Sequence, residues 1–199
     1  MMHKKTPEIV TPEDSKSYTG GPVGISGPPG AGKTIIGKKI AKKLGVAFYD
    51  LDEIISKKVG LKNTKEIIEK YGRPYFWKNE HVCIKEIFKR KSKPYVLAFS
   101  GGVICHRNTT PLKEKNKTLI KKNIFHICLM PSSNLKESVS ILWPRHDDGK
   151  RAGVKTSNQL QSYLKTRMSQ YTEGVDRIVY TYYAPIEKVV PAVLEILKK

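Results

Sequence analysis

The sequence predicts an α/β protein in which a parallel β-sheet is covered by helices on both faces. Short apolar runs typical of buried strands alternate along the chain with longer stretches in which apolar residues recur at helical spacing. This is the pattern of successive βαβ units. The first apolar run is followed by a glycine-rich loop and then by a helical stretch, an order typical of proteins that bind a phosphate group at a helix N-terminus.

Five segments are predicted to be strands because they are short, apolar and bounded by turn residues. In chain order they are PVGIS (22–26), VAFYD (46–50), YVLAFS (95–100), NIFHICLM (123–130) and DRIVYT (176–181). The third of these has the strongest strand character and runs directly into the glycine pair Gly101 and Gly102.

The stretches between these strands are predicted to be helical. In the first of them, apolar residues fall at helical spacing with lysines opposite, and Gly45 is a natural helix end; the apolar residues are Ile35, Ile36, Ile40 and Leu44. Ser132 or Ser133 is placed to cap a helix after the fourth strand. The other expected helices cover 50–60, 64–71, 75–91, 156–171 and 186–199.

Length and composition indicate one globular domain. The chain has 199 residues, enough to bury a core, and 39% of them are hydrophobic. We expect residues 1–20 to be a flexible segment and 21–199 to form the domain. The three cysteines are widely spread and form no C-x-x-C pair, which excludes a disulfide scaffold and a four-cysteine zinc site. No apolar run suits a membrane span or a signal peptide, so we expect a cytoplasmic monomer without membrane contact.

The net charge of +19 is large, and all but seven of the 37 basic residues are lysines. Such a charge is compatible with nucleic-acid binding, but no zinc finger or aromatic–basic RNA-binding pattern accompanies it. We interpret it as a lysine-rich solvated surface that attracts anionic substrates, and we do not expect a nucleic-acid partner.

The glycine-rich loop matches the phosphate-binding pattern G-x-x-x-x-G-K-T at every fixed position. Its glycines allow successive backbone N–H groups to point at phosphate oxygens, and the helix N-terminus adds positive charge. Lys33 would reach the β- and γ-phosphates of a bound nucleotide, and the Thr34 hydroxyl would bind Mg²⁺. The predicted nucleotide-binding residues are Gly27, Pro28, Pro29, Gly30, Ala31, Gly32, Lys33 and Thr34.

Two carboxylates, Asp50 and Asp52, close the second predicted strand. At the end of a parallel strand near the phosphate loop, one can hold Mg²⁺ through water. The other can accept a hydrogen bond, and finally a proton, from a hydroxyl group. An acidic helix N-terminus is the alternative interpretation. The guanine-binding N-K-x-D of GTPase switches is absent, which favours a small-molecule kinase.

The chain resembles the shikimate kinase family over residues 22–198. GPPGAGKT and the following IGKKIAKKLGVAFYDLDEII are similar to that family's phosphate loop, first helix and D-x-D strand. YGRPYFWKNE resembles its motif G-E-x-x-F-R-x-x-E, with Gly72, Phe76 and Glu80 aligned. FSGG (99–102) resembles its triple-glycine turn, and the segment Arg167–Tyr171 resembles its R-x-x-x-Y.

This resemblance implies a three-layer P-loop fold with a five-stranded parallel sheet, a helical substrate-binding region at 52–92 and a mobile lid at 143–155. It also implies ATP- and Mg²⁺-dependent phosphorylation of shikimate to shikimate 3-phosphate. Asp50 and Thr34 match the metal site, and Asp52 matches the residue that binds the acceptor hydroxyl and acts as base. Gly101, Gly102 and Arg167 match substrate-binding positions, the arginine binding a carboxylate.

The chain departs from the family pattern at four places. Trp77 replaces an arginine, Arg73 replaces the motif glutamate, and Ser100 replaces the first glycine of the turn. In the lid, Trp143-Pro144 stands for Arg-Pro, with Arg145 two positions late. Arg73 or Arg145 is a candidate substitute for the lost arginine, and Trp77 offers a flat apolar wall to the acceptor.

We expect Arg145 to act as a catalytic lid residue that neutralises charge on the transferring phosphoryl group. Two alternatives to a shikimate kinase stay open at this point. One is a nucleoside monophosphate kinase, against which the D-x-D pair argues. The other is a nucleotide-binding regulator derived from the same fold that has lost catalysis, which the replacements by Trp77 and Trp143 suggest.

Overall fold

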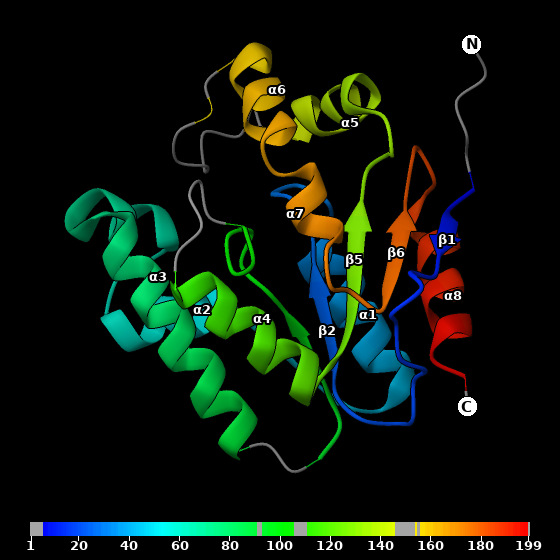
Figure 1. Cartoon of the computed structure of the whole chain (residues 1–199), viewed down its shortest axis with the longest axis horizontal. Helices are drawn as coiled ribbons and strands as arrows, with labels where there is room; N and C mark the ends of the chain where they lie inside the picture. The colour runs from blue at the N-terminus through cyan, green and yellow to red at the C-terminus, as the bar shows by residue number, and fades with distance from the viewer. Residues whose placement is uncertain (1–5, 91–92, 106–110, 146–153, 155, 199) are drawn as a thin grey trace.

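The computed structural model describes residues 6–90, 93–105, 111–145, 154 and 156–198. Its centre is a six-stranded sheet in the order β1-β6-β5-β2-β4-β3 (Figure 1). Five strands run parallel, and β1 pairs antiparallel with β6. The strands are β1 Glu8–Val10, β2 Val23–Ser26, β3 Ala47–Asp50, β4 Tyr95–Ala98, β5 Phe125–Met130 and β6 Arg177–Tyr180.

Helices cover both faces of the sheet, as the sequence predicts. In Figure 1, α2, α3 and α4 lie on one side, α1 and α8 lie on the other, and α5 and α6 lie beyond the carboxyl ends of the strands. The helices are α1 Lys33–Leu44, α2 Leu51–Val59, α3 Thr64–Arg90, α4 Pro111–Asn123, α5 Leu135–Leu142, α6 Ser157–Lys165, α7 Met168–Thr172 and α8 Ile186–Ile196, with a 3₁₀ turn η1 at Trp143–Arg145.

Two hydrophobic clusters hold these layers together. Strands β2, β4 and β5 are buried along their whole length, which explains their continuous apolar runs. On one face, Ile36 and Ile40 of α1 share a cluster with Val189 and Val193 of α8. On the other face, the apolar sides of α2 and α3 pack with residues of β4 and β5. The apolar stripes read from the sequence therefore form the core.

The parallel arrangement brings three chain segments to one edge of the sheet. Strand β4 lies between β2 and β3, so the carboxyl ends of all three are adjacent. The phosphate loop follows β2, Asp50 ends β3, and the turn with Gly101 and Gly102 follows β4. Ligands of open α/β sheets bind at this edge, between the loops that leave the strands.

All five predicted strands are present, but the expected count of five is wrong by one. The sixth strand, β1, comes from the segment 1–20 that was expected to be flexible. It has three residues, too few to give a recognisable alternation in the sequence. It pairs with β6 and satisfies backbone groups that would otherwise lie at an open sheet edge.

The helices also differ from the prediction at three places. Residues 111–123, for which no helix was predicted, form α4, a lysine-rich helix with few apolar residues. The expected helix 156–171 is broken into α6 and α7 at Arg167. The long helix α3 joins the two stretches predicted at 64–71 and 75–91 through a kink at Gly72 (φ 80°, ψ 167°). Within the described residues, no helix combines the length and apolar character that crossing a bilayer requires.

We predict that Asp176→Ala lowers the free energy of unfolding by about 2–3 kcal/mol, because two backbone N–H groups lose a charged acceptor. The Asp176 carboxylate accepts from the buried His126 N–H (2.7 Å) and from the Lys16 N–H (3.1 Å), which ties the N-terminal segment to β5. Urea unfolding measures the change. The control is Glu195→Ala, which removes an exposed ion pair with Lys198 and should change stability by less than about 0.5 kcal/mol. Equal effects of the two variants would contradict this assignment.

Candidate functional site

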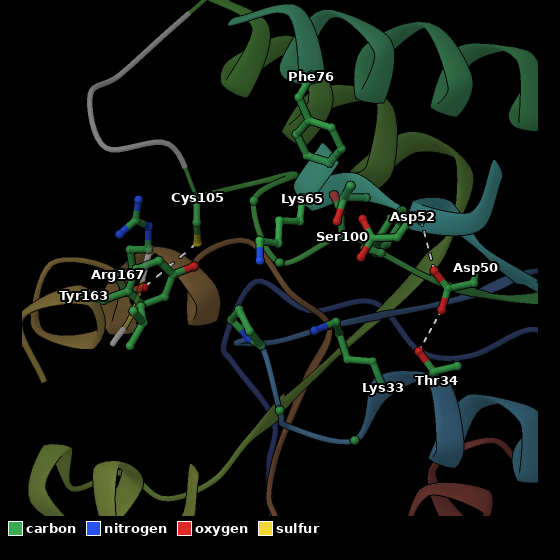
Figure 2. Close-up of a pocket in the computed structure, with 18 of the residues that line it drawn as sticks. Lys33, Thr34, Asp50, Asp52, Lys65, Phe76, Ser100, Cys105, Tyr163 and Arg167 are labelled. Carbon is green, nitrogen blue, oxygen red and sulfur yellow. Dashed lines mark hydrogen bonds between the residues drawn. The ribbon is translucent and has the colours of Figure 1, made fainter. Parts of the chain in front are cut away.

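A cleft of about 610 Å³ opens at the carboxyl ends of β2, β3 and β4. Its walls come from the phosphate loop, the start of α2, α3, the turn after β4, η1, α6 and Arg167 at the start of α7. Figure 2 shows side chains from these elements directed into one space. Thirteen predicted site residues line it: Pro29, Gly30, Gly32, Lys33, Thr34, Asp50, Asp52, Arg73, Trp77, Gly101, Gly102, Arg145 and Arg167.

The phosphate loop has the backbone that its glycines predict. Gly27 (φ 139°), Gly30 (φ 85°) and Gly32 (φ 90°) all have positive φ, which L side chains rarely adopt. A Cβ atom on Gly27 would lie 2.2 Å from the carbonyl oxygen of Leu129, so only glycine fits there. The Lys33 ammonium donates to the carbonyl oxygens of Gly27 (3.0 Å) and Pro28 (3.1 Å), so the lysine folds over the loop that it follows. Of the predicted loop residues, Gly27, Pro28 and Ala31 shape this curve without lining the cleft.

Asp50 connects the phosphate loop to α2. One carboxylate oxygen accepts a hydrogen bond from the Thr34 hydroxyl (2.7 Å), and the other accepts from the Asp52 N–H (3.0 Å) and caps the helix. Asp50 is therefore a helix N-cap and also faces the loop. A hydroxyl and a carboxylate oxygen are ligands suited to Mg²⁺. The described residues contain no group of three His, Cys, Asp or Glu that could hold a metal, so phosphate and water oxygens would complete such a site.

Asp52 lies in the cleft beside these groups. Burial, and to a smaller extent the Asp50 carboxylate, raise the pKa of Asp52 to about 6, while the Lys33 ammonium lowers it. Figure 2 shows the Asp52 carboxylate and the Lys33 ammonium directed into the same space. A carboxylate with this pKa is ionised at neutral pH and is basic enough to accept a proton from a hydroxyl group during its reaction.

Arg167 occupies the other side of the cleft in Figure 2. It is 9% exposed, and its guanidinium lies over the ring of Tyr163, 4.0 Å from the centroid. Its Nε is buried and has no hydrogen-bond partner among the described residues. The break between α6 and α7 places this arginine in the cleft. Stacking fixes the guanidinium plane and leaves N–H groups available for an anionic ligand.

The turn after β4 is held from two sides. The Tyr171 hydroxyl donates to the carbonyl oxygen of Gly101 (2.7 Å) and lies 3.2 Å from the hydroxyl of Tyr163. The Ser100 hydroxyl donates to the carboxyl group of Glu80, which comes from α3. A Cβ atom on Gly101 would lie 3.2 Å from the ring of Pro29, so the turn packs closely against the phosphate loop.

Sequence reasoning missed some residues of this site. Lys65, at the start of α3, lines the cleft, and Figure 2 shows its ammonium directed into it. It is one of many lysines, so its type alone gives no indication of a role. Tyr163 was also missed, although its spacing of four residues from Arg167 in the predicted helix could have indicated their contact. Glu80 was recognised only as a motif position, and its fully buried contact with Ser100 joins residues 20 positions apart.

The expected lid falls mainly outside the described residues, since its segments 146–153 and 155 are not among them. Trp143 at its start packs against a small cluster of Leu142, Leu160 and Leu164 between α5 and α6. Arg145 follows, and its Nη1 donates to the carbonyl oxygen of Gly30 at 3.0 Å. The predicted lid arginine therefore touches the phosphate loop.

Comparison with solved structures shows the same fold in shikimate kinases. A shikimate kinase from Acinetobacter baumannii in complex with shikimate has a TM-score of 0.72 at 25% sequence identity, covering 90% of this chain and 94% of that one. The enzyme from Aquifex aeolicus has a TM-score of 0.68 at 24% identity over 88% of this chain and 95% of its own, which shows the fold alone.

Comparison of sequences points the same way. Shikimate kinases from Thermodesulfovibrio yellowstonii, Macrococcus caseolyticus and Marinomonas are 39%, 41% and 33% identical, over 53%, 44% and 54% of this chain. These alignments span about half the length of the relatives (56%, 50% and 55%). The shikimate kinase of Dictyoglomus turgidum is 31% identical over 85% of this chain and 92% of its own. Since the shikimate kinase family model also matches residues 29–198, this chain belongs to the shikimate kinase family.

Proposed function

We propose that this protein transfers the γ-phosphoryl group of ATP to a hydroxyl of a small carboxylated polyol, shikimate, giving shikimate 3-phosphate, with Mg²⁺ as cofactor. The observation that carries the proposal is one cleft that holds a phosphate-binding loop, a basic carboxylate and a buried arginine. Membership of the shikimate kinase family supports it, as does the likeness to a structure that binds shikimate.

The phosphate loop would bind the triphosphate. Its backbone N–H groups and the N-terminus of α1 attract phosphate oxygens. Lys33 would leave the carbonyl oxygens of Gly27 and Pro28, which it binds at 3.0 and 3.1 Å, and donate to the phosphates instead. Thr34 and Asp50 would hold Mg²⁺, which when bound neutralises charge on the phosphate oxygens.

The acceptor would lie between Asp52 and Arg167. Asp52 would accept a hydrogen bond from the attacking hydroxyl, hold it in line with the γ-phosphorus and finally take its proton. Arg167, fixed by its stack on Tyr163, would bind the acceptor carboxylate through paired N–H groups. Lys65 and Arg73 add positive charge in the same cleft, and Trp77, Gly101 and Gly102 give the acceptor its wall.

Arg145 would assist phosphoryl transfer from the lid side. Its contact with Gly30 places a guanidinium at the phosphate loop, where it would neutralise charge on the transferring group. A monomeric state, a cytoplasmic location and the absence of a nucleic-acid partner stay predictions.

We predict that the purified protein phosphorylates shikimate with ATP and Mg²⁺, and that Lys33→Ala abolishes this activity while the fold survives. The reason is that Lys33 carries the charge nearest the phosphates. A coupled assay with shikimate, AMP and CMP measures turnover, and circular dichroism monitors the fold. Turnover with AMP or CMP alone would indicate a nucleoside monophosphate kinase. ATP binding without turnover of any acceptor would indicate a non-catalytic regulator, and a fully active Lys33→Ala would contradict the role of the loop.

We predict that Asp52→Asn lowers kcat by about 10²–10⁴-fold without weakening ATP binding, because the amide cannot accept the hydroxyl proton. With a pKa of about 6, Asp52 becomes protonated as the pH falls through this value, so the wild-type kcat should decline below pH 6. The measurement is the pH profile of kcat, with calorimetry for ATP. Glu53→Gln is the control, since this neighbouring acid is exposed and does not line the cleft. A wild-type rate for Asp52→Asn would remove Asp52 from the catalytic role.

A further inference from the structure

Two departures from the family pattern meet at one buried residue, Glu80. Ser100, which stands where the family has glycine, donates its hydroxyl hydrogen bond to Oε1 of Glu80. Trp77, which stands where the family has arginine, approaches Gly102 from the same side as Glu80 does. A Cβ atom placed on Gly102 would lie 3.7 Å from Glu80 Oε1 and 3.9 Å from Trp77 Nε1. The two replacements therefore act on one local environment.

Glu80 lies where a carboxylate is poorly stabilised. Its side chain is fully buried, and its second oxygen, Oε2, has no hydrogen-bond partner within the described part of the chain. Burial raises the pKa of Glu80 to about 8, the Ser100 hydroxyl lowers it, and the Asp52 carboxylate of α2 raises it further. Burial is the main cause that raises the pKa of the Cys83 thiol, one turn along α3, and Glu80 adds to it. Glu80 is therefore a neutral acid at neutral pH.

The turn that Ser100 begins determines where an acceptor can lie. Ser100, Gly101 and Gly102 line the cleft, whereas Glu80 is not among its lining residues. Figure 2 shows Ser100 and Arg167 on opposite sides of it. On one side the turn is tied to α3 through Glu80, and on the other to α7 through Tyr171. Movement of the turn would shift the space between Pro29 and Arg167.

We infer that Ser100 and Glu80 form an uncharged hydrogen-bonded pair that positions the turn at 100–102 and, with Trp77, makes a neutral wall of the acceptor pocket. This inference rests on the proposed function. The wall accepts the uncharged face of the acceptor, so that its carboxylate is bound on the side of Arg167 and Lys65. Ser100 and Glu80 are thus positioning residues. They also determine specificity, because an arginine at position 77 would favour an ionised Glu80 and the wall would then carry charge.

The first test removes the donor. Ser100→Gly should raise the KM for shikimate about tenfold and leave the KM for ATP within twofold, because Glu80 loses its partner and the turn loses one of its two side-chain ties. Ser133→Gly, in an exposed loop position, is the control and should change neither constant. An unchanged KM for shikimate in Ser100→Gly would overturn the inference.

The second test is a double-mutant cycle with Trp77→Arg. An arginine at position 77 would lie near Glu80 and pair with its ionised form. It should therefore reverse much of the increase in the KM for shikimate that Ser100→Gly causes. When Ser100 is present, the decrease in the KM for shikimate that Trp77→Arg causes should be at least threefold smaller. An equal decrease in the KM for shikimate with Ser100 and with Ser100→Gly would mean that the arginine acts directly on the acceptor, and the inference would fail.

The third test needs no substrate. The native state keeps the proton of Glu80 up to about pH 8, whereas the unfolded chain loses it near pH 4.5. The stability that this group contributes is therefore complete below pH 4.5 and is lost as the pH rises through 8. The Tm of Glu80→Gln relative to wild type should rise by several degrees between pH 7 and 9, a window above the titration of Asp52 near pH 6.

These readouts separate the inference from the proposed function. If the wild type does not phosphorylate shikimate, the proposed function fails, while the Tm comparison still shows whether Glu80 is a neutral acid. If the Tm difference is independent of pH, the neutral pair is refuted whatever the activity. With an active wild type, the KM for shikimate should rise above pH 8 and stay flat in Glu80→Gln. A common pH profile for both proteins would also refute the pair.

Discussion

The site depends on the hydrogen bonds of one carboxylate, Asp50. Through Thr34 it fixes the first turn of α1, and through the Asp52 N–H it fixes the first turn of α2. The phosphate loop and the acceptor-side acid therefore cannot move independently. Helix capping and metal binding, which the sequence presents as alternatives for this residue, use different oxygens of the same group, so both are compatible with its geometry.

The sequence predicts those parts of the molecule whose cause is local. The five parallel strands are continuous apolar runs, and the phosphate loop has glycines at positions that require positive φ, so both can be read from short segments. Strand β1 could not be read, because three residues become a strand only when β6 offers an edge. Helix α4 has few apolar residues, and its place is fixed by buried contacts such as that of Asn116 with the carbonyl oxygen of Val103.

Two features of the candidate site could not be read from the sequence, because one is a break in a predicted helix and the other is a contact between distant segments. Arg167 was predicted to bind substrate, but the break of the expected helix 156–171 at this residue was not predicted. Its stacking partner is Tyr163, four residues earlier. In the sequence, Ser100 is only a departure from the family pattern, because it replaces the first glycine of the turn. In the structure it is the hydrogen-bond donor to Glu80, so the replacement belongs to a compensated set with Trp77.

Asp52, a half-buried acid of the cleft, and Glu80, a fully buried acid beside it, illustrate how environment assigns different roles to similar groups. Asp52 and Glu80 are both destabilised as anions by burial, but only Asp52 has an ammonium, that of Lys33, among the groups that lower its pKa. With pKa values of about 6 and about 8, Asp52 is charged and Glu80 is neutral at pH 7. A negative charge on either carboxyl group disfavours ionisation of the other. A protonated Glu80 therefore makes it easier for Asp52 to remain an anion. The neutral wall and the catalytic base are thus coupled: an ionised Glu80 would raise the pKa of Asp52 and leave less of the base in the form that accepts the hydroxyl proton.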